Sequence, residues 1–205
     1  MQLIGYLDSP FVRRVAISMR MLEIEFQHRE LSIFRDFEEF RAINPLVKVP
    51  TLLLDDGQLL VDSNLIIEYL EKFHSTNSLM PNNDEAYAAA SQHIGVALIV
   101  MEKVAGLIYE TSQRGQDKQD PGWTDRLRTQ LGGAVSMMEA AVTDCAVDGW
   151  MFGEEMTQAD ISIAVAWRFT QHIEVADINA SDYPALRQYS ARCEALAEFI
   201  ACPLG

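Results

Sequence analysis

The hydrophobic period of the chain changes several times within the first 75 residues, which restricts the folds available to this part. Residues 2–6 form a short apolar run and predict a strand. The apolar residues that follow recur at the three- and four-residue spacing of an amphipathic helix: Val12, Val15, Ala16, Met19 and Leu22. Residues 26–31 predict a second strand, and the polar, aromatic-containing residues 34–43 predict a second, short helix.

A hairpin is predicted next. Residues 51–54 and 58–61 are apolar and flank an Asp-Gly pair at positions 56–57, and Asp-Gly between two apolar runs is a strong local hairpin signal. Ser63 then caps a helix that runs through residue 73. The order strand, helix, strand, helix, hairpin and helix predicts an α/β domain.

The second half of the chain has helical periodicity throughout. Residues 85–110 and 123–142 predict two long helices. Thr157-Gln-Ala-Asp160 resembles a capping box, and the nearly all-apolar residues 161–169 follow it. A helix that is apolar on every side is buried, so we expect this one in the core of a second domain.

The boundary between the two parts is predicted at residues 75–84, which are rich in Ser, Asn and Pro and have no periodicity. We therefore expect a first domain over residues 1–76 and an α-helical second domain over residues 86–205. The expected fold class is α/β followed by all-α.

Composition excludes several protein classes. The chain has 205 residues, 49% of them hydrophobic, and can bury a substantial core. Its longest apolar run, residues 94–101, is about eight residues long, whereas a membrane span needs roughly 18 to 20. No basic segment precedes a long apolar stretch near residue 1, so we expect a cytoplasmic protein without a membrane partner.

Charge and cysteine usage narrow the partners further. A formal net charge of −14 repels phosphate backbones, so nucleic acid is not an expected partner. Cys145, Cys193 and Cys202 are widely spaced and form no Cys-x-x-Cys pair. This usage indicates a reducing compartment and no metal site.

Ser9 precedes Pro10 at the turn between the first strand and the first helix. Free backbone N–H groups and the helix dipole favour an anion at such a turn. A serine hydroxyl there can donate a hydrogen bond to a thiolate. Taken alone, the pair is more typical of an ordinary N-cap serine followed by proline.

Two further pairs stand where a peptide ligand could bind. Val49-Pro50 lies directly before a strand, where a cis peptide bond exposes the preceding N–H and C=O groups and an extended peptide can pair with Val49. Asp62-Ser63 lies at a helix start, where Ser63 and the free amides can hold a carboxylate while Asp62 holds an amino group. Each pair alone also fits a purely structural role.

In this order, the Ser-Pro, Val-Pro and Asp-Ser pairs resemble the thioredoxin-like domain of the cytosolic glutathione transferases. The linker, the long helix after it, and Thr157-Gln-Ala-Asp160 before a buried helix are similar to the all-helical second domain of that family. The resemblance covers essentially the whole chain. It implies a thioredoxin-like N-terminal domain, an α-helical C-terminal domain, glutathione as co-substrate and a homodimer.

The resemblance also implies roles for residues around the turn. Ser9 matches the catalytic hydroxyl of the serine-type classes, which donates a hydrogen bond to the glutathione sulfur. Val49 matches the backbone group that holds the cysteinyl unit, and Pro50 matches the cis-proline. Phe11 is expected beside glutathione and at the pocket for the second substrate.

The two ends of glutathione are assigned in the same way. Asp62 and Ser63 match the pair that binds the γ-glutamyl head. Lys48 matches a polar side chain near the glycyl end. Arg35, thirteen residues before Lys48, stands where some serine-type relatives contact the glycyl carboxylate.

Departures from the family pattern restrict which of the family's activities we expect. No cysteine occupies the turn, which argues against the thiol reductases of the family. Tyr6 ends the first strand, where tyrosine-type classes carry their catalytic hydroxyl, and it is the alternative to Ser9. Isomerase-type relatives usually carry Ser-Ser-Cys at the turn, whereas this chain has Leu7-Asp8-Ser9, so we do not expect that activity.

The predicted reaction is attack of the glutathione thiolate on a small apolar electrophile. We expect the electrophile pocket between the domains, lined by apolar residues: Phe11, Met101, Ile108, Tyr109 and Trp167. Apolar residues at helical spacing also fit core packing. Two alternatives stay open, namely a non-enzymatic interaction protein that docks a basic partner on its acidic surface, and a ligandin that binds apolar molecules without turnover.

Overall fold

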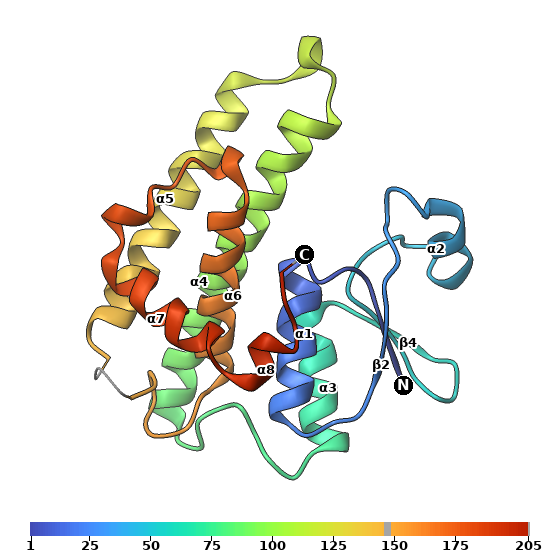
Figure 1. The fold of residues 1–205 in the computed structure, drawn as a ribbon, viewed down its shortest axis with the longest axis vertical. Helices are drawn as coiled ribbons and strands as arrows, with labels where there is room; N and C mark the ends of the chain where they lie inside the picture. Colours follow the sequence, from blue (N-terminus) through green and yellow to red (C-terminus); the bar gives the residue numbers. More distant parts are fainter. Residues whose placement is uncertain (146–148, 205) are drawn as a thin grey trace. The chain divides into compact units, whose positions relative to one another are not determined.

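The computed structural model describes residues 1–145 and 149–204, which form two compact units. The first unit contains Met1–Leu79 and the segment that begins at Leu196, and the second is Met80–Ala195. The ribbon follows both units along the chain (Figure 1). The predicted second domain, residues 86–205, includes four residues outside the described part, 146–148 and 205. The predicted domain limits stay a prediction.

The first unit is built on a four-stranded sheet with the order β2-β1-β3-β4. Strand β1 runs parallel to β2 and antiparallel to β3, and the β3–β4 hairpin is antiparallel as the Asp-Gly signal predicted. The elements of this unit are β1 (Gln2–Ile4), α1 (Pro10–Met21), β2 (Gln27–Arg29), α2 (Phe37–Ile43), β3 (Thr51–Leu53), β4 (Leu59–Val61), α3 (Ser63–His74) and α8 (Ala197–Ile200).

Helices cover both faces of this sheet. Helices α1 and α3 pack against each other on one face, and α2 lies on the other (Figure 1). Ile4 of β1, Leu31 and Phe40 of α2 form one buried cluster, because the alternation of side chains along a strand sends successive residues to opposite faces. This arrangement confirms the predicted thioredoxin-like domain.

The C-terminal segment belongs to the first unit because α1 holds it. Helix α8 packs against α1, and Arg13 donates from Nε to the carbonyl oxygen of Cys202 at 2.8 Å. The Arg13 guanidinium also lies over the Phe199 ring, 5.8 Å from its centroid. The predicted second domain, residues 86–205, includes this segment, because a short helix without a long periodic pattern carries no sign of the partner it packs against.

The second unit is helical, as predicted. Its elements are α4 (Asp84–Ile108), the π-helical turn η1 (Tyr109–Gln113), the 3₁₀ turn η2 (Gln116–Lys118), α5 (Pro121–Thr143), α6 (Gln158–His172), the 3₁₀ turns η3 (Glu174–Ala176) and η4 (Ala180–Asp182), and α7 (Pro184–Glu194). Among residues 1–145 and 149–204, no helix combines the length and apolar character needed to cross a membrane.

Helix α6 forms the core of this unit. It packs against α4 and α7, and its residues Ile161, Ile163 and Val165 are buried. Asp160 accepts a hydrogen bond from the backbone N–H of Thr157 at 2.6 Å, which is the reciprocal bond of the predicted capping box. A helix buried on all sides needs this local satisfaction of its first amides.

Candidate active site

Ser9 lies at the N-cap position of α1, but its hydroxyl does not cap the helix. Its backbone is extended (φ −74°, ψ 120°), and its side chain makes no capping hydrogen bond. The Ser9 N–H donates to Tyr6 O at 3.2 Å, and Arg13 N donates to Ser9 O at 2.9 Å. The next residue, Pro10, has no N–H. The half-buried hydroxyl is therefore available to a ligand at the positive end of the helix dipole.

Gly5 brings the end of β1 close to two other parts of the site. It has φ +135°, and a Cβ atom there would lie 2.7 Å from Cγ2 of Val12 and 2.8 Å from Cγ1 of Val49. Only a residue without a side chain allows this approach. Helix α1, the turn before it and the segment before β3 consequently meet at one place.

The Val49-Pro50 peptide bond is cis, as predicted. The loop before it is held by its own polar groups. Asn44 donates from Nδ2 to Thr51 Oγ1 at 2.8 Å, and Thr51 Oγ1 donates to Lys48 O at 2.7 Å. In the part of the chain described, the N–H and C=O of Val49 enter no hydrogen bond. An extended peptide can therefore pair with them.

The Asp62-Ser63 turn differs from the sequence prediction in one respect. Asp62, and not Ser63, is the N-cap residue of α3, and its side chain accepts from Asn64 N at 2.8 Å. Ser63 is the first helical residue and is only 2% exposed. Its Oγ accepts a hydrogen bond from Nη1 of Arg14 at 2.9 Å, so a buried partner rather than the helix amides occupies its acceptor side.

Arg14 is the residue of this region that the sequence analysis missed. It is 1% exposed, and Nη1 also donates to Asn64 Oδ1 at 2.6 Å. Burial lowers the pKa of Arg14 to about 10, although Asp62 acts in the opposite direction, so the group stays charged at neutral pH. The signal that could have identified it is an arginine pair between Val12 and Val15, inside an otherwise apolar helix segment.

Arg35 lies at the same end of the sheet as the Ser9 turn. Its guanidinium carbon is 5.0 Å from the centroid of the Tyr6 ring, a cation–π contact. Arg35 and Lys48 are both exposed and carry positive charge. Tyr6 thus presents its ring face to Arg35.

The residues predicted to line the electrophile pocket have different surroundings in their own units. Phe11 is half-buried in the first unit. Met101 and Trp167 are 0% and 3% exposed and belong to the helical core, whereas Tyr109 is 43% exposed. Ile108, the last residue of α4, is half-buried. Their role as pocket residues stays a prediction, with Ile108 and Tyr109 the more accessible members of the helical unit.

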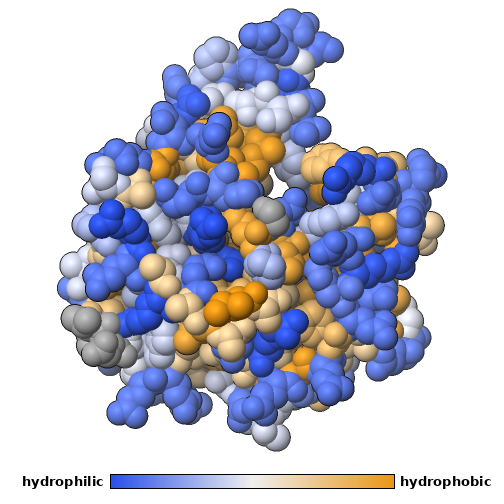
Figure 2. Space-filling model, viewed as in Figure 1, coloured by the Kyte–Doolittle hydropathy of each residue, from blue (hydrophilic) through white to orange (hydrophobic). Residues whose placement is uncertain are grey.

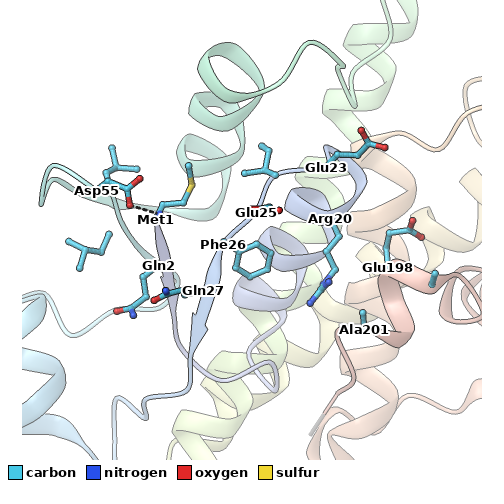
Figure 3. Close-up of a pocket in the computed structure, with 14 residues that line it drawn as sticks. Met1, Gln2, Arg20, Glu23, Glu25, Phe26, Gln27, Asp55, Glu198 and Ala201 are labelled. Atoms are coloured by element: carbon cyan, nitrogen blue, oxygen red, sulfur yellow. Dashed lines mark hydrogen bonds and ion pairs between the residues drawn. The ribbon is translucent and has the colours of Figure 1, made fainter.

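A groove in the first unit lies elsewhere. It has a volume of about 990 Å³ and is lined by the start of β1, the end of α1 and α8. Figure 3 shows Arg20 and Phe26 beside it, and the ion pair of 2.6 Å between the Met1 ammonium and Asp55 at its rim. Since Met1 and Ser9 lie beyond opposite ends of β1, this groove does not coincide with the candidate site.

Comparison with known proteins supports the resemblance to the glutathione transferases. The family model of the glutathione S-transferase N-terminal domain matches residues 3–78. A maleylacetoacetate isomerase from Pseudomonas aeruginosa is 30% identical over 92% of this chain and 94% of its own length. Glutathione S-transferase 1 from Manduca sexta is 28% identical, with 92% of this chain and 85% of that protein covered.

Solved structures of glutathione transferases have the same fold as this chain. A glutathione S-transferase from Methylobacterium radiotolerans, in complex with glutathione sulfonate, has a TM-score of 0.89 at 23% identity and covers 98% of this chain and 93% of its own, which shows the fold. A glutathione transferase family member from Pseudomonas fluorescens, with bound glutathione, has a TM-score of 0.84 at 25% identity and covers 100% and 98%.

The first unit is a thioredoxin-like domain whose first turn carries a serine without a capping hydrogen bond, and a helical unit follows it in the chain. Together with the relatives, these features place the protein in the class of glutathione-dependent transferases and isomerases. The chain belongs to the cytosolic glutathione transferase family, on the evidence of its whole-length relationship to the Pseudomonas aeruginosa protein.

Proposed function

We propose that this protein is a glutathione transferase that joins the glutathione thiolate to a small apolar electrophile. The observation that carries the proposal is the Ser9 hydroxyl, which stands at the N-terminus of α1 without a capping hydrogen bond. A serine at an N-cap normally uses its side chain on the helix amides. Here the hydroxyl is left for a ligand, and glutathione is the ligand bound in related structures.

Glutathione would lie along the edge of the first unit. Its cysteinyl backbone pairs with the open N–H and C=O of Val49 as an added strand. Its γ-glutamyl carboxylate takes the hydroxyl of Ser63 and the first amides of α3, and its amino group takes the exposed carboxylate of Asp62. Its glycyl carboxylate is drawn to Lys48 and Arg35.

The proposed role of Ser9 is to lower the thiol pKa. A free thiol has a pKa of about 8.5, so little thiolate exists at neutral pH. A hydrogen bond to a charged sulfur contributes roughly 1.5–3 kcal/mol and the helix terminus about 0.3–1 kcal/mol. Since 1.4 kcal/mol corresponds to about one pKa unit, the pKa falls by about 1 to 3 units. At the small end of this range the thiolate is a substantial minority at pH 7, and at the large end it dominates.

The electrophile would be held by apolar side chains. Phe11 from the first unit and Ile108 and Tyr109 from the end of α4 supply apolar surface and retain some exposure. Met101 and Trp167 are the other proposed members of this set, and both are buried in the helical unit.

We also propose a homodimer in the cytoplasm. In the first unit Leu46, Leu65 and Phe73 are 63%, 60% and 63% exposed, and such apolar surface favours association. Apolar residues also reach the surface around α2 (Figure 2). The three cysteines are free thiols, in keeping with a reducing compartment. Sedimentation at micromolar concentration should give a dimer, and a monomer would refute this part.

Thiolate absorbance of the glutathione complex, followed against pH, tests the proposal. Ser9→Ala should raise the titration midpoint by about 1 to 2 units and slow conjugation near pH 7 by roughly 10- to 100-fold. The fold should be unaffected, because the hydroxyl does not cap α1. Ser91→Ala, at an exposed serine bonded to its own helix, is the control. Identical midpoints for Ser9→Ala and wild type would leave Ser9 without a catalytic role and favour Tyr6.

The same assays separate the other functions. Glutathione binding without turnover would indicate a ligandin, and absence of both would indicate a docking protein. The name of the Pseudomonas aeruginosa relative favours a second activity, isomerisation of maleylacetoacetate. The turn Leu7-Asp8-Ser9 lacks the Ser-Ser-Cys run usual in isomerase-type members, so we expect conjugation to exceed isomerisation. Faster isomerisation than conjugation would reverse this assignment.

A further inference from the structure

One buried side chain joins the two helices whose N-termini face the candidate site. Arg14 belongs to the second turn of α1, close to Ser9, and reaches the first residues of α3. Its Nη1 atom lies 2.9 Å from Ser63 Oγ and 2.6 Å from Asn64 Oδ1. Both Arg14 and Ser63 are almost completely buried, at 1% and 2% exposure. The contact is therefore shielded from water.

The chemistry of a guanidinium decides the direction of these hydrogen bonds. A guanidinium has only N–H donors and no acceptor. Ser63 Oγ must therefore accept from Arg14, and its own hydroxyl proton is left to donate elsewhere. Asn64 likewise presents its Oδ1 to Arg14, which turns its NH₂ group away. The α3 N-terminus thus presents donors to a ligand.

We propose that Arg14 is a positioning residue that holds Ser63 as a hydrogen-bond donor and so makes the α3 N-terminus select a carboxylate over a neutral head group. This inference rests on the proposed binding of the γ-glutamyl head there. It adds a residue that does not touch the ligand and that acts through Ser63. It also links the turn that holds the sulfur to the turn that holds the head group.

Electrostatics act in the same direction. The buried charge of Arg14 and the dipole of α3 both favour an anion at Ser63. Asp62 supplies the opposite sign on the exposed side of the turn, and its carboxylate is held by Asn64 N at 2.8 Å. A zwitterionic head group, with its carboxylate toward Ser63 and its ammonium toward Asp62, fits this pair of charges. A group without the carboxylate leaves the Ser63 donor unsatisfied.

The test compares two ligands on each protein: glutathione, and glutathione whose γ-glutamyl α-carboxylate is converted to the amide. The wild type should prefer glutathione by about 10-fold or more. Arg14→Gln should reduce this preference to less than about threefold, because a carboxamide can accept as well as donate and no longer sets the direction of the Ser63 hydroxyl. Arg14→Lys, a donor-only cation, should restore most of it.

Arg13→Gln is the matched control, since Arg13 is equally buried but bonds the C-terminal segment at Cys202. It should lower thermal stability without changing the preference between the two ligands. Equal weakening of both ligands in Arg14→Gln would assign Arg14 a purely structural role and overturn the proposal.

If the variants do not fold, the ligand preference of the wild type still tests the proposal. A preference below threefold, with glutathione still bound, overturns the selection by a carboxylate. Failure of the wild type to bind glutathione at all contradicts the proposed function instead. The two failures are therefore distinguishable.

Discussion

Asp160 is a buried carboxylate at the start of α6, and its two oxygens accept two hydrogen bonds each. Oδ2 accepts from the N–H and hydroxyl of Thr157 at 2.6 Å and 2.5 Å. Oδ1 accepts from Met151 N at 2.9 Å and from the Tyr189 hydroxyl. The side chain is 0% exposed, so water cannot replace a lost partner. Asp160 therefore ties the start of α6 to the segment before it and to α7.

Asp160→Asn should strongly destabilise the helical unit. The change replaces one acceptor oxygen with an NH₂ group that faces one backbone N–H and one hydroxyl. The hydroxyl can turn and accept from the NH₂ group, but the backbone N–H loses its hydrogen bond to a charged group. Since one such bond contributes about 1.5–3 kcal/mol, the free energy of unfolding should fall by roughly 1.5–3 kcal/mol. Domains are typically stable by only about 5–15 kcal/mol. Urea denaturation followed by the fluorescence of the three tryptophans, all of which lie in this unit, measures the change.

Two other variants make the Asp160 experiment specific. Glu155→Gln removes the same charge from an exposed position nearby and should change the unfolding free energy by less than about 0.5 kcal/mol. Tyr189→Phe removes one of the four bonds and should give an intermediate loss. Burial raises the pKa of Tyr189, and Asp160 acts in the same direction, so its hydroxyl remains a donor across the usual pH range. A loss below about 1 kcal/mol in Asp160→Asn would refute this account of the network.

The remaining predictions concern the head-group site and pH. Ser63→Ala and Asp62→Asn should each weaken glutathione binding by roughly 1–3 kcal/mol in calorimetric titration, because a charged end of the ligand loses its partner. Unchanged affinity in both variants would place the head group elsewhere. Burial lowers the pKa of His93 from 6.5, against the opposing effect of Asp160, so the unfolded chain takes up a proton first as pH falls. The unfolding free energy should therefore decrease as pH falls through about 6.5, and His93→Gln should flatten this decrease. Parallel pH profiles for the two proteins would contradict the reasoning.

Much of the fold was predictable because its signals are local. The Asp-Gly pair at 56–57 between two apolar runs predicted the β3–β4 hairpin, and the structure has it. Thr157 and Asp160 predicted the start of α6, and the reciprocal bond of the capping box is present. Turn and cap preferences depend on residues a few positions apart, so a single sequence contains them.

Local reasoning failed where a side chain has two possible partners. Ser63 was expected to cap α3, but Asp62 occupies the N-cap and accepts from Asn64. Ser9 fits the pattern of a cap, yet its hydroxyl makes no capping bond. Residue type at a helix start predicts the position of the turn, because backbone geometry is local. It does not predict which donor or acceptor the side chain finally meets.

Local sequence signals were enough to predict the order of elements, the resemblance to the family, and the placement of Ser9, Val49-Pro50 and Asp62-Ser63 at three turns. The burial of Arg14 and its hydrogen bond to Ser63, 49 positions further along the chain, result from the packing of α1 against α3. Periodicity describes one element at a time and states which face turns inward, but it contains no information on which side chains of two packed helices come within hydrogen-bond distance. A buried guanidinium is tolerated only where packing supplies acceptors, and those acceptors come from another helix.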